Sequence, residues 1–332
     1  MKKVLALLVA VLLVFSFAAC GGGQQKTEAK TYKVGVTIYQ FDDNFMTLYR
    51  TEMENYFKSL ETDSVKYDVT IMDAANDMAT QVEQVNTFIA QGVDVLIVNL
   101  VQTSSAEQVT NLVQEAGIPC VLINREPAEE FIGENMCYVG ADARQSGTYQ
   151  GEIVAELENK GDINGDGVVK YIMIMGDPEN TDAQYRTEYS IKALEDAGIT
   201  VECLFQQTGN WAQDQGQELV ANALASFGND IEVVFCNNDA MALGAFQAIQ
   251  GAGRTVGTDI YLLGVDALTE CCQMVLDGTM TGTVLNDHIA QSHAAVDAAI
   301  AYLNGETVEK YIWANYTKVT AENAQEILDI LQ

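Results

Sequence analysis

The chain has 332 residues and carries 47 acidic against 17 basic side chains, a formal net charge of −30 at pH 7. This acidic excess excludes nucleic acids and anionic lipid surfaces as partners. The chain is also too long for a single hydrophobic core, so we expect two domains.

Residues 1–19 have the layout of a signal peptide: two lysines, an apolar run and then small residues. The segment FAAC is similar to a bacterial lipobox, in which Cys20 becomes the lipidated first residue of the mature protein. The alternative is plain secretory cleavage beside an unmodified Cys20. The glycines and polar residues of 20–31 predict a flexible tether. We therefore expect an extracytoplasmic protein, lipid-anchored to the bacterial cell membrane at the cell surface or in the periplasm, that touches the membrane only through its anchor.

From residue 32 onward, strand and helix patterns alternate. The strand-like runs are almost continuously apolar, which is typical of a parallel sheet covered on both faces. The segments between them carry apolar residues three and four positions apart, as amphipathic helices do. This first series contains strands at 32–39, 67–74, 93–100 and 118–124 and helices at about 44–60, 77–91 and 104–116.

The same pattern then starts again. This second series contains strands at 169–177, 199–207, 231–239, 259–267 and 282–288 and helices at about 182–197, 212–227, 240–252 and 289–303. The two halves share the same order of strands and helices but not the same residues. They predict an α/β fold with two doubly wound parallel-sheet lobes.

Asp or Asn follows nearly every predicted strand. In open parallel sheets, ligands bind beyond the carboxyl ends of the strands. Each of these residues alone can serve in a turn or as a helix N-cap. Together they predict a cleft lined by carboxylates and amides. They are Asp42, Asp43, Asn44, Asn99, Asn124, Asp177, Asn238, Asp239, Asp266, Asn286 and Asp287.

Carboxylates and amides supply directed hydrogen-bond acceptors and donors without redox or nucleophilic power. This chemistry suits a neutral polyol, whose apolar C–H faces can stack on aromatic rings such as Phe45 and Trp211. Trp211 can equally be a core or capping residue. Asp182 and Arg186 are one helical turn apart, so they can pair. That pair either faces solvent and contributes little or presents a guanidinium to a ligand.

Two other kinds of site are weighed against binding. Paired carboxylates can be the acid and nucleophile of a glycosidase, but no second acid stands at a fixed spacing in an apolar niche. The sequence also lacks a GxSxG motif, a GxGxxG motif and a Walker loop. Six cysteines follow Cys20 without any CxxC pair, so we expect no zinc site, and their disulfide state stays open. We expect a binding protein rather than an enzyme.

Seven segments carry a family resemblance. VGVTIYQFDDNF, LIVNLV, VLINREP, YVGADARQSG, FCNNDAMALGA, LLGVDA and GTVLND resemble the periplasmic galactose/glucose-binding proteins, which serve ABC sugar import and chemotaxis. The resemblance covers about residues 32–320. The segments NNDAMALGA and GVDA also occur across the wider type I sugar-binding group, whereas FDDNF together with GTVLND is more specific. No helix-turn-helix precedes the domain, which excludes the regulator branch of that group.

This resemblance implies two Rossmann-like lobes joined by a three-segment hinge. We expect residues 32–123 plus 288–317 in the N-terminal lobe and 124–287 plus 318–332 in the C-terminal lobe. The implied ligand is a monosaccharide, galactose or glucose, bound between the lobes and delivered to an ABC transporter permease. A pentose or another aldohexose is the alternative ligand, and a chemoreceptor is an alternative partner.

The resemblance also implies a set of sugar-binding residues. Phe45 and Trp211 are expected to stack on the ring, and Asn180 stands where the family usually has histidine, so the hydroxyl that it contacts stays open. The expected hydrogen-bonding residues are Asp43, Asn99, Asn180, Asp182, Arg186, Asn238, Asp266 and Asn286.

Residues 162–170, DINGDGVVK, resemble the calcium loop of the family. Lys170 stands where a glutamine usually supplies an oxygen ligand, and its ammonium repels Ca²⁺. Either water fills this position and Ca²⁺ binds weakly, or the ammonium replaces the ion, or the loop is a turn without metal. The ligands that the resemblance implies are Asp162, Asn164, Asp166, the carbonyl of Val168 and a bidentate Glu232.

Overall fold

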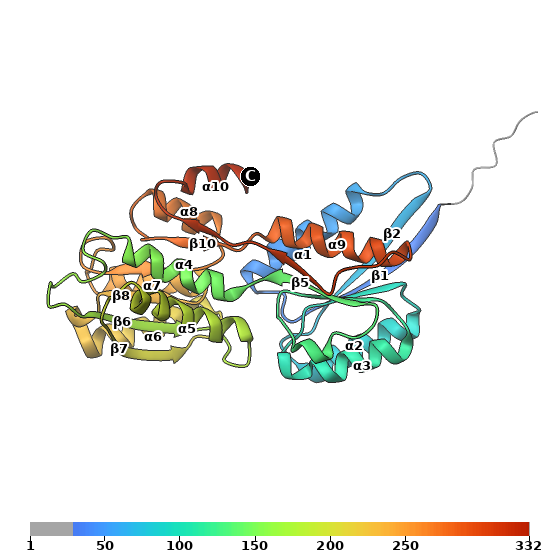
Figure 1. The fold of residues 1–332 in the computed structure, drawn as a ribbon, viewed down its shortest axis with the longest axis horizontal. Coiled ribbons are helices and arrows are strands. Elements are labelled where there is room, and N and C mark those ends of the chain that lie inside the picture. The colour runs from blue at the N-terminus through green and yellow to red at the C-terminus, as the bar shows by residue number, and fades with distance from the viewer. Residues whose placement is uncertain (1–28, 332) are drawn as a thin grey trace, which may run out of the picture.

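The computed structural model describes residues 29–331. Two lobes lie side by side along the longest axis of the molecule (Figure 1). Each lobe is a parallel sheet with helices on both faces, so the predicted fold class is confirmed. The predicted signal peptide and Cys20 lie outside the described residues. Within residues 29–331, no helix combines the length and the apolar character needed to cross a membrane.

The first lobe is built on a six-stranded parallel sheet in the order β11-β5-β4-β3-β1-β2. The central strands consist of apolar residues that are buried on both faces, as parallel packing requires. Its strands are β1 (Lys30–Ile38), β2 (Val65–Asp73), β3 (Val95–Val98), β4 (Cys120–Ile123), β5 (Met136–Ala141) and β11 (Tyr311–Ala314).

Four helices cover this sheet. Alternate side chains of each strand point to opposite faces and form two separate hydrophobic cores. One core contains α1 (Asn44–Ser59) and α9 (His288–Leu303), and the other contains α2 (Met78–Gln91) and α3 (Ala106–Ala116). Short 3₁₀ turns lie at Thr103–Ser105 and Glu129–Phe131.

The second lobe has a four-stranded parallel sheet in the order β7-β6-β8-β9. Helices α4 (Ala143–Ala155) and α5 (Thr181–Asp196) cover one face. The other face carries α6 (Gln213–Phe227), α7 (Asp239–Gly251), α8 (Thr269–Leu276) and α10 (Ala324–Ile330). The strands are β6 (Val169–Met175), β7 (Val201–Thr208), β8 (Val233–Cys236) and β9 (Tyr261–Leu263), with an antiparallel pair β10 (Thr283–Leu285) and β12 (Thr317–Val319) and a 3₁₀ turn at Gly228–Asp230.

The chain crosses between the lobes three times: between β5 and α4, between β10 and α9, and between β11 and β12 (Figure 1). The first crossing differs from the expected boundary after residue 123. Residues 136–141, expected in the C-terminal lobe, form β5 of the first sheet, where Cys120 of β4 pairs with Met136. The reason is that MCYVGA is a fully buried strand, which the sequence analysis did not assign.

Candidate functional site

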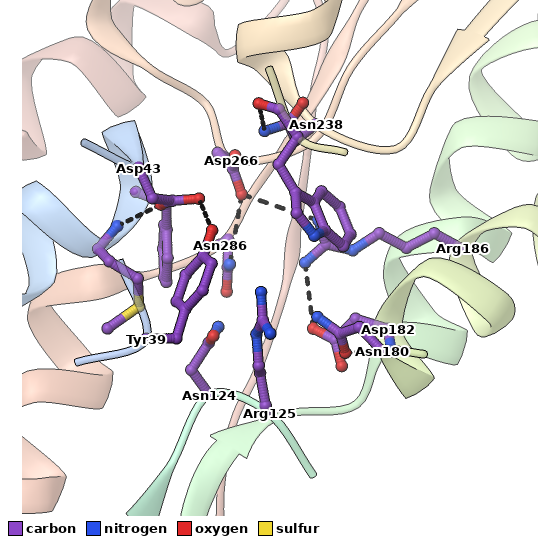
Figure 2. Close-up of a pocket in the computed structure, with 13 residues that line it drawn as sticks. Tyr39, Asp43, Asn124, Arg125, Asn180, Asp182, Arg186, Asn238, Asp266 and Asn286 are labelled. Atoms are coloured by element: carbon purple, nitrogen blue, oxygen red, sulfur yellow. Dashed lines mark hydrogen bonds and ion pairs between the residues drawn. The ribbon is translucent and has the colours of Figure 1, made fainter. Parts of the chain in front are cut away.

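One pocket is lined by residues of both lobes. Figure 2 shows the side chains converging from the strand ends and helix N-termini of the two lobes. The lining residues are Tyr39, Asp43, Phe45, Met46, Asn124, Arg125, Asn180, Asp182, Arg186, Trp211, Asn238, Asp266 and Asn286.

Asp43 is held at the pocket wall by the start of α1. Its Oδ1 accepts from the backbone N–H of Met46 at 2.7 Å, so Asp43 is the N-cap of the helix. Its Oδ2 accepts from the hydroxyl of Tyr39 at 2.5 Å. The carboxylate oxygens therefore keep their remaining lone pairs for a ligand in a fixed direction.

Arg186 forms the charged centre of the second lobe's contribution. Its guanidinium lies 3.4 Å from Asp182 Oδ2 and 3.9 Å from Asp266 Oδ1. It also donates to the carbonyl of Asn237 at 2.8 Å and to the hydroxyl of Tyr316 at 3.0 Å. The predicted pairing of Asp182 with Arg186 is thus buried rather than solvated, since both side chains are less than a tenth exposed.

The buried carboxylates titrate far from their usual range. Burial raises the pKa of Asp182 to about 6, although Arg186 and Arg125 oppose the shift. Burial likewise raises the pKa of Asp266 well above its usual value, and nearby Asp239 and Asp43 raise it further against Arg186. Ligand hydroxyls that donate to these oxygens stabilise the charged forms, so this pocket is suited to a ligand rich in hydrogen-bond donors.

Asn180 and Asn238 are N-caps at the pocket rim. Asn180 Oδ1 accepts from the backbone N–H of Asp182 at 3.0 Å, which fixes the first turn of α5. Asn238 Oδ1 accepts from the N–H of Met241 at 3.0 Å, and its amide donates to the carbonyl of Trp211 at 3.2 Å. Each amide retains at least one N–H without a partner among residues 29–331.

Asp266 and Asn286 form the wall next to the hinge. Asn286 Nδ2 donates to Asp266 Oδ1 at 3.4 Å, and Gln291 Nε2 donates to Asn286 Oδ1 at 2.6 Å. Asp266 has a φ of 128°, a strained backbone conformation for a residue other than glycine. Asn286 directly follows β10 at a crossing between the lobes, so the binding wall and the hinge share this residue.

Trp211 and Phe45 bring aromatic rings to the pocket from opposite lobes. Trp211 has a φ of 66°, and its ring lies directly over Gly176, where an added Cβ would come within 2.1 Å of the ring atom Cζ2. Gly176 therefore makes room for the indole. Phe45 packs edge-on against Tyr49, with ring centroids 6.0 Å apart.

Arg125 lines the pocket but was not among the predicted site residues. Its guanidinium carbon lies 3.6 Å from the centroid of the Tyr39 ring, a cation–π geometry. It also donates to the carbonyl of Val101. Neighbouring Asn124, which has a φ of 62°, lines the pocket beside it. A cationic residue directly after a buried strand, in VLINREP, was the available sequence signal.

The prediction for Asn99 is corrected. This residue is fully buried behind the pocket and is not among the lining residues. Its Oδ1 accepts from the N–H of Tyr39 at 3.3 Å, and its Nδ2 donates to the carbonyl of Ile123 and to Asn124 Oδ1, both at 3.2 Å. Asn99 therefore ties β1 to β4 and supports Asn124, which faces the cavity in its place. The pocket brings together all the other predicted sugar-binding residues.

Three hydrogen-bond donors at the pocket have no partner among the described residues: Nε of Arg125, Nε of Arg186 and Nε1 of Trp211. Buried donors are normally satisfied, so their presence here points to a ligand with acceptor oxygens. The carboxylates of Asp43, Asp182 and Asp266 accept. A polyhydroxylated ligand, in which each hydroxyl both donates and accepts, satisfies both sets.

In the predicted calcium loop, Lys170 Nζ lies 2.6 Å from Asp166 Oδ2, so an ammonium contacts one of the expected ligand oxygens. Within residues 29–331, no three or more His, Cys, Asp or Glu side chains converge in a way that could hold a metal ion.

The six cysteines of this part of the chain are unpaired, five of them buried and Cys203 exposed.

Comparison with known proteins agrees with this architecture. The family described as "Periplasmic binding protein domain" matches residues 34–307. The chain belongs to this family. Its relatives are ligand-binding proteins rather than enzymes, which confirms the prediction of a binding protein.

Three relatives illustrate the range of the family. The D-galactose/methyl-galactoside binding periplasmic protein MglB of Haemophilus influenzae is 36% identical over 304 residues, 90% of this chain and 89% of that protein. A putative rhizopine-binding protein of Rhizobium meliloti is 35% identical, covering 90% and 94%. The crystal structure of an ABC transporter solute-binding protein of Bacillus halodurans with bound myo-inositol has a TM-score of 0.80 at 32% identity, covering 91% and 98%.

Proposed function

We propose that this chain is a lipid-anchored extracytoplasmic receptor that binds galactose or glucose between its two lobes and delivers it to an ABC transporter permease. The observation that carries the proposal is the matched set of groups in one pocket. Carboxylates accept, the Nε atoms of Arg125 and Arg186 and the indole Nε1 of Trp211 donate, and each lobe contributes one aromatic ring. A cyclic polyol meets all three requirements at once.

The proposed roles follow the geometry. The oxygens of Asp43 and Asp182 accept from sugar hydroxyls, and Arg186 donates through its free Nε. Phe45 and Trp211 stack on the apolar faces of the ring. The remaining hydrogen-bonding groups are contributed by Asn124, Arg125, Asn180, Asn238, Asp266 and Asn286.

Closure of the lobes couples binding to delivery. Contacts from one sugar to both lobes favour the closed arrangement, in which Thr103 Oγ1 donates to the carbonyl of Glu179 across the cleft at 2.9 Å. A permease or a chemoreceptor that contacts both lobes would distinguish loaded from empty receptor. We propose transport as the main role, since ABC solute-binding proteins are among the relatives.

A cyclitol is the second candidate ligand. The Bacillus halodurans relative holds myo-inositol at 32% identity, and the galactose-binding relative is only slightly closer at 36%. Both ligand classes are six-membered rings bearing hydroxyls, so both suit the same donors and acceptors. Asn180 is the lining residue at which this chain departs from the galactose/glucose resemblance.

Isothermal titration calorimetry with galactose, glucose, xylose, ribose and myo-inositol tests the proposal. We expect heat with at least one hexose, with an affinity about tenfold or more weaker in Asp43→Asn and unchanged in the control Asp77→Asn, which changes an N-cap away from the pocket lining. If only myo-inositol gave heat, the ligand of this pocket would be a cyclitol rather than a hexose. Mass spectrometry of the mature N-terminus tests the anchor: an acylated Cys20 is expected, and a free N-terminus elsewhere contradicts it.

A further inference from the structure

The loop between α4 and β6 is closed by its own side chains. Asp162 accepts from the backbone N–H of Gly165 at 2.7 Å through Oδ1 and from that of Gly167 at 2.9 Å through Oδ2. Both glycines have positive φ, 75° and 89°, which lets the chain fold back over the carboxylate. Asn164 Oδ1 accepts from the N–H of Asp166 at 2.8 Å.

Glu232, just before β8, joins this loop to the sheet. Its Oε1 accepts from the backbone N–H of Ile163 at 2.7 Å and of Asn164 at 3.0 Å, and its Oε2 accepts from that of Lys170 at 2.9 Å. Glu232 is only 1% exposed, so this buried carboxylate links the loop to the start of β8. The backbone bonds account for the shape of the loop but leave its negative charge uncompensated.

Lys170 supplies the missing positive charge. Its Nζ lies 2.6 Å from Asp166 Oδ2, and its side chain is 21% exposed. Ca²⁺ in proteins needs six to eight oxygen ligands at about 2.3–2.6 Å, and an ammonium offers none. A divalent ion beside Asp166 would also face the Lys170 charge at close range, which is repulsive.

We propose that the ammonium of Lys170 takes the place of a metal ion in the 162–170 loop, so that this loop is closed by an internal cation and does not bind Ca²⁺. The inference rests on the contacts of the loop and is independent of which sugar the pocket holds. The residue at position 170 would then decide whether this loop needs a metal ion to close.

The test compares thermal unfolding of the purified protein in excess CaCl₂ and in a calcium-selective chelator. We expect the same Tm in both for the unmodified protein. Lys170→Gln, which removes the charge and adds an oxygen ligand, should gain a calcium-dependent rise in Tm of about 2 °C or more. Lys170→Met removes the charge without adding oxygen, so it should gain much less. A single cooperative unfolding transition reports that each variant is folded.

Two results would overturn the proposal. One is a calcium-dependent rise in the Tm of the unmodified protein that Asp162→Asn abolishes, because the ion would then bind beside Lys170. The other is a folded Lys170→Gln protein with no response to Ca²⁺ in calorimetry or unfolding, because the lysine would then not be what excludes the ion. A magnesium arm distinguishes calcium binding from a general effect of divalent salt.

Discussion

The hydroxyl of Tyr39 donates to one oxygen of Asp43 at 2.5 Å, while the other oxygen of Asp43 caps α1 through the N–H of Met46. The helix thus fixes the orientation of a pocket carboxylate. Asn is as good an N-cap as Asp, so Asp43→Asn should leave Tm nearly unchanged. It should weaken sugar binding by about tenfold or more, because hydrogen bonds to a charged group are worth about 1.5–3 kcal/mol.

Asp77→Ala is the complementary variant, because Asp77 caps α2 by accepting from the N–H of Thr80 at 2.6 Å and is not among the pocket-lining residues. Asp77→Ala should lower the free energy of unfolding by about 1 kcal/mol and leave the sugar Kd unchanged. Unfolding curves and calorimetry on both variants separate capping from ligand contact. An unchanged Kd in Asp43→Asn would remove this carboxylate from the site.

Gly176 tests the role of the Trp211 ring without changing the ring itself. A Cβ at Gly176 would lie 2.1 Å from Cζ2 of the indole, so Gly176→Ala must displace the ring. We expect sugar affinity to fall about tenfold or more, since a displaced ring loses its stacking on the sugar. Quenching or shift of tryptophan fluorescence on binding should shrink in parallel.

Gly251→Ala is the control for this substitution, because a Cβ there meets no atom within 4 Å at the end of α7. It should bind sugar normally and be equally or slightly more stable. If Gly176→Ala bound sugar as tightly as Gly251→Ala, the indole would not be part of the binding surface.

Much of the fold follows from sequence patterns, but the lobe boundary does not. The buried strands and the caps of the βαβ series are local signals, so their positions were predictable. Strand β5 was missed because MCYVGA follows a loop containing Pro127 and no amphipathic helix, which breaks the alternation. Its pairing with β4 is a tertiary contact that periodicity does not encode.

In the site, too, some residues could be predicted from local sequence and others depend on tertiary contacts. Asn99 and Asn124 both follow buried strands, and nothing local says which amide faces the cleft. The structure resolves this through backbone conformation: Asn124 has a φ of 62°, whereas Asn99 is enclosed between β1 and β4. Arg125 was missed because arginine is usually exposed, and its burial depends on Tyr39, which directly follows β1.

Asp182 should make sugar binding depend on pH. Its pKa is raised to about 6 by burial, so the carboxylate is ionised at pH 7 and protonated at pH 5. Under the proposed roles, sugar hydroxyls donate to the ionised form and lower its pKa, so Kd should rise by up to tenfold per pH unit as pH falls through about 6. Calorimetry from pH 5 to 7.5 measures this slope.

The stability of the sugar-free protein should move in the opposite direction. The folded pKa of Asp182 is about 6, above its ordinary 3.8, so its protonation favours the folded state. This contribution is fully present below pH 3.8 and is lost as pH rises through about 6. Asp266 adds to the same trend, because burial raises its pKa as well. Asp182→Asn should therefore reduce both slopes without abolishing the stability trend. If the pH slopes of Kd and of stability were unchanged in Asp182→Asn, groups other than Asp182 would cause the pH dependence.

Arg125 should set the position of this pH dependence. The guanidinium is one of the two groups that lower the pKa of Asp182, and it comes from the opposite lobe. Arg125→Met should therefore move the midpoint of the affinity–pH curve above its position near pH 6, in addition to weakening binding through the lost Nε donor. Arg125→Lys keeps the charge and should keep the midpoint while affinity falls.

The control for a purely structural effect is Arg254→Met. Arg254 donates to the carbonyls of Gly228 and Ile231 and is not among the pocket-lining residues. This variant should lower Tm and leave the midpoint in place. A midpoint that is the same in Arg125→Met as in Arg254→Met would mean that no charge acts across the cleft on Asp182. A midpoint that moves only in Arg125→Met would place that charge in the bound, closed state, where the two lobes meet around the ligand.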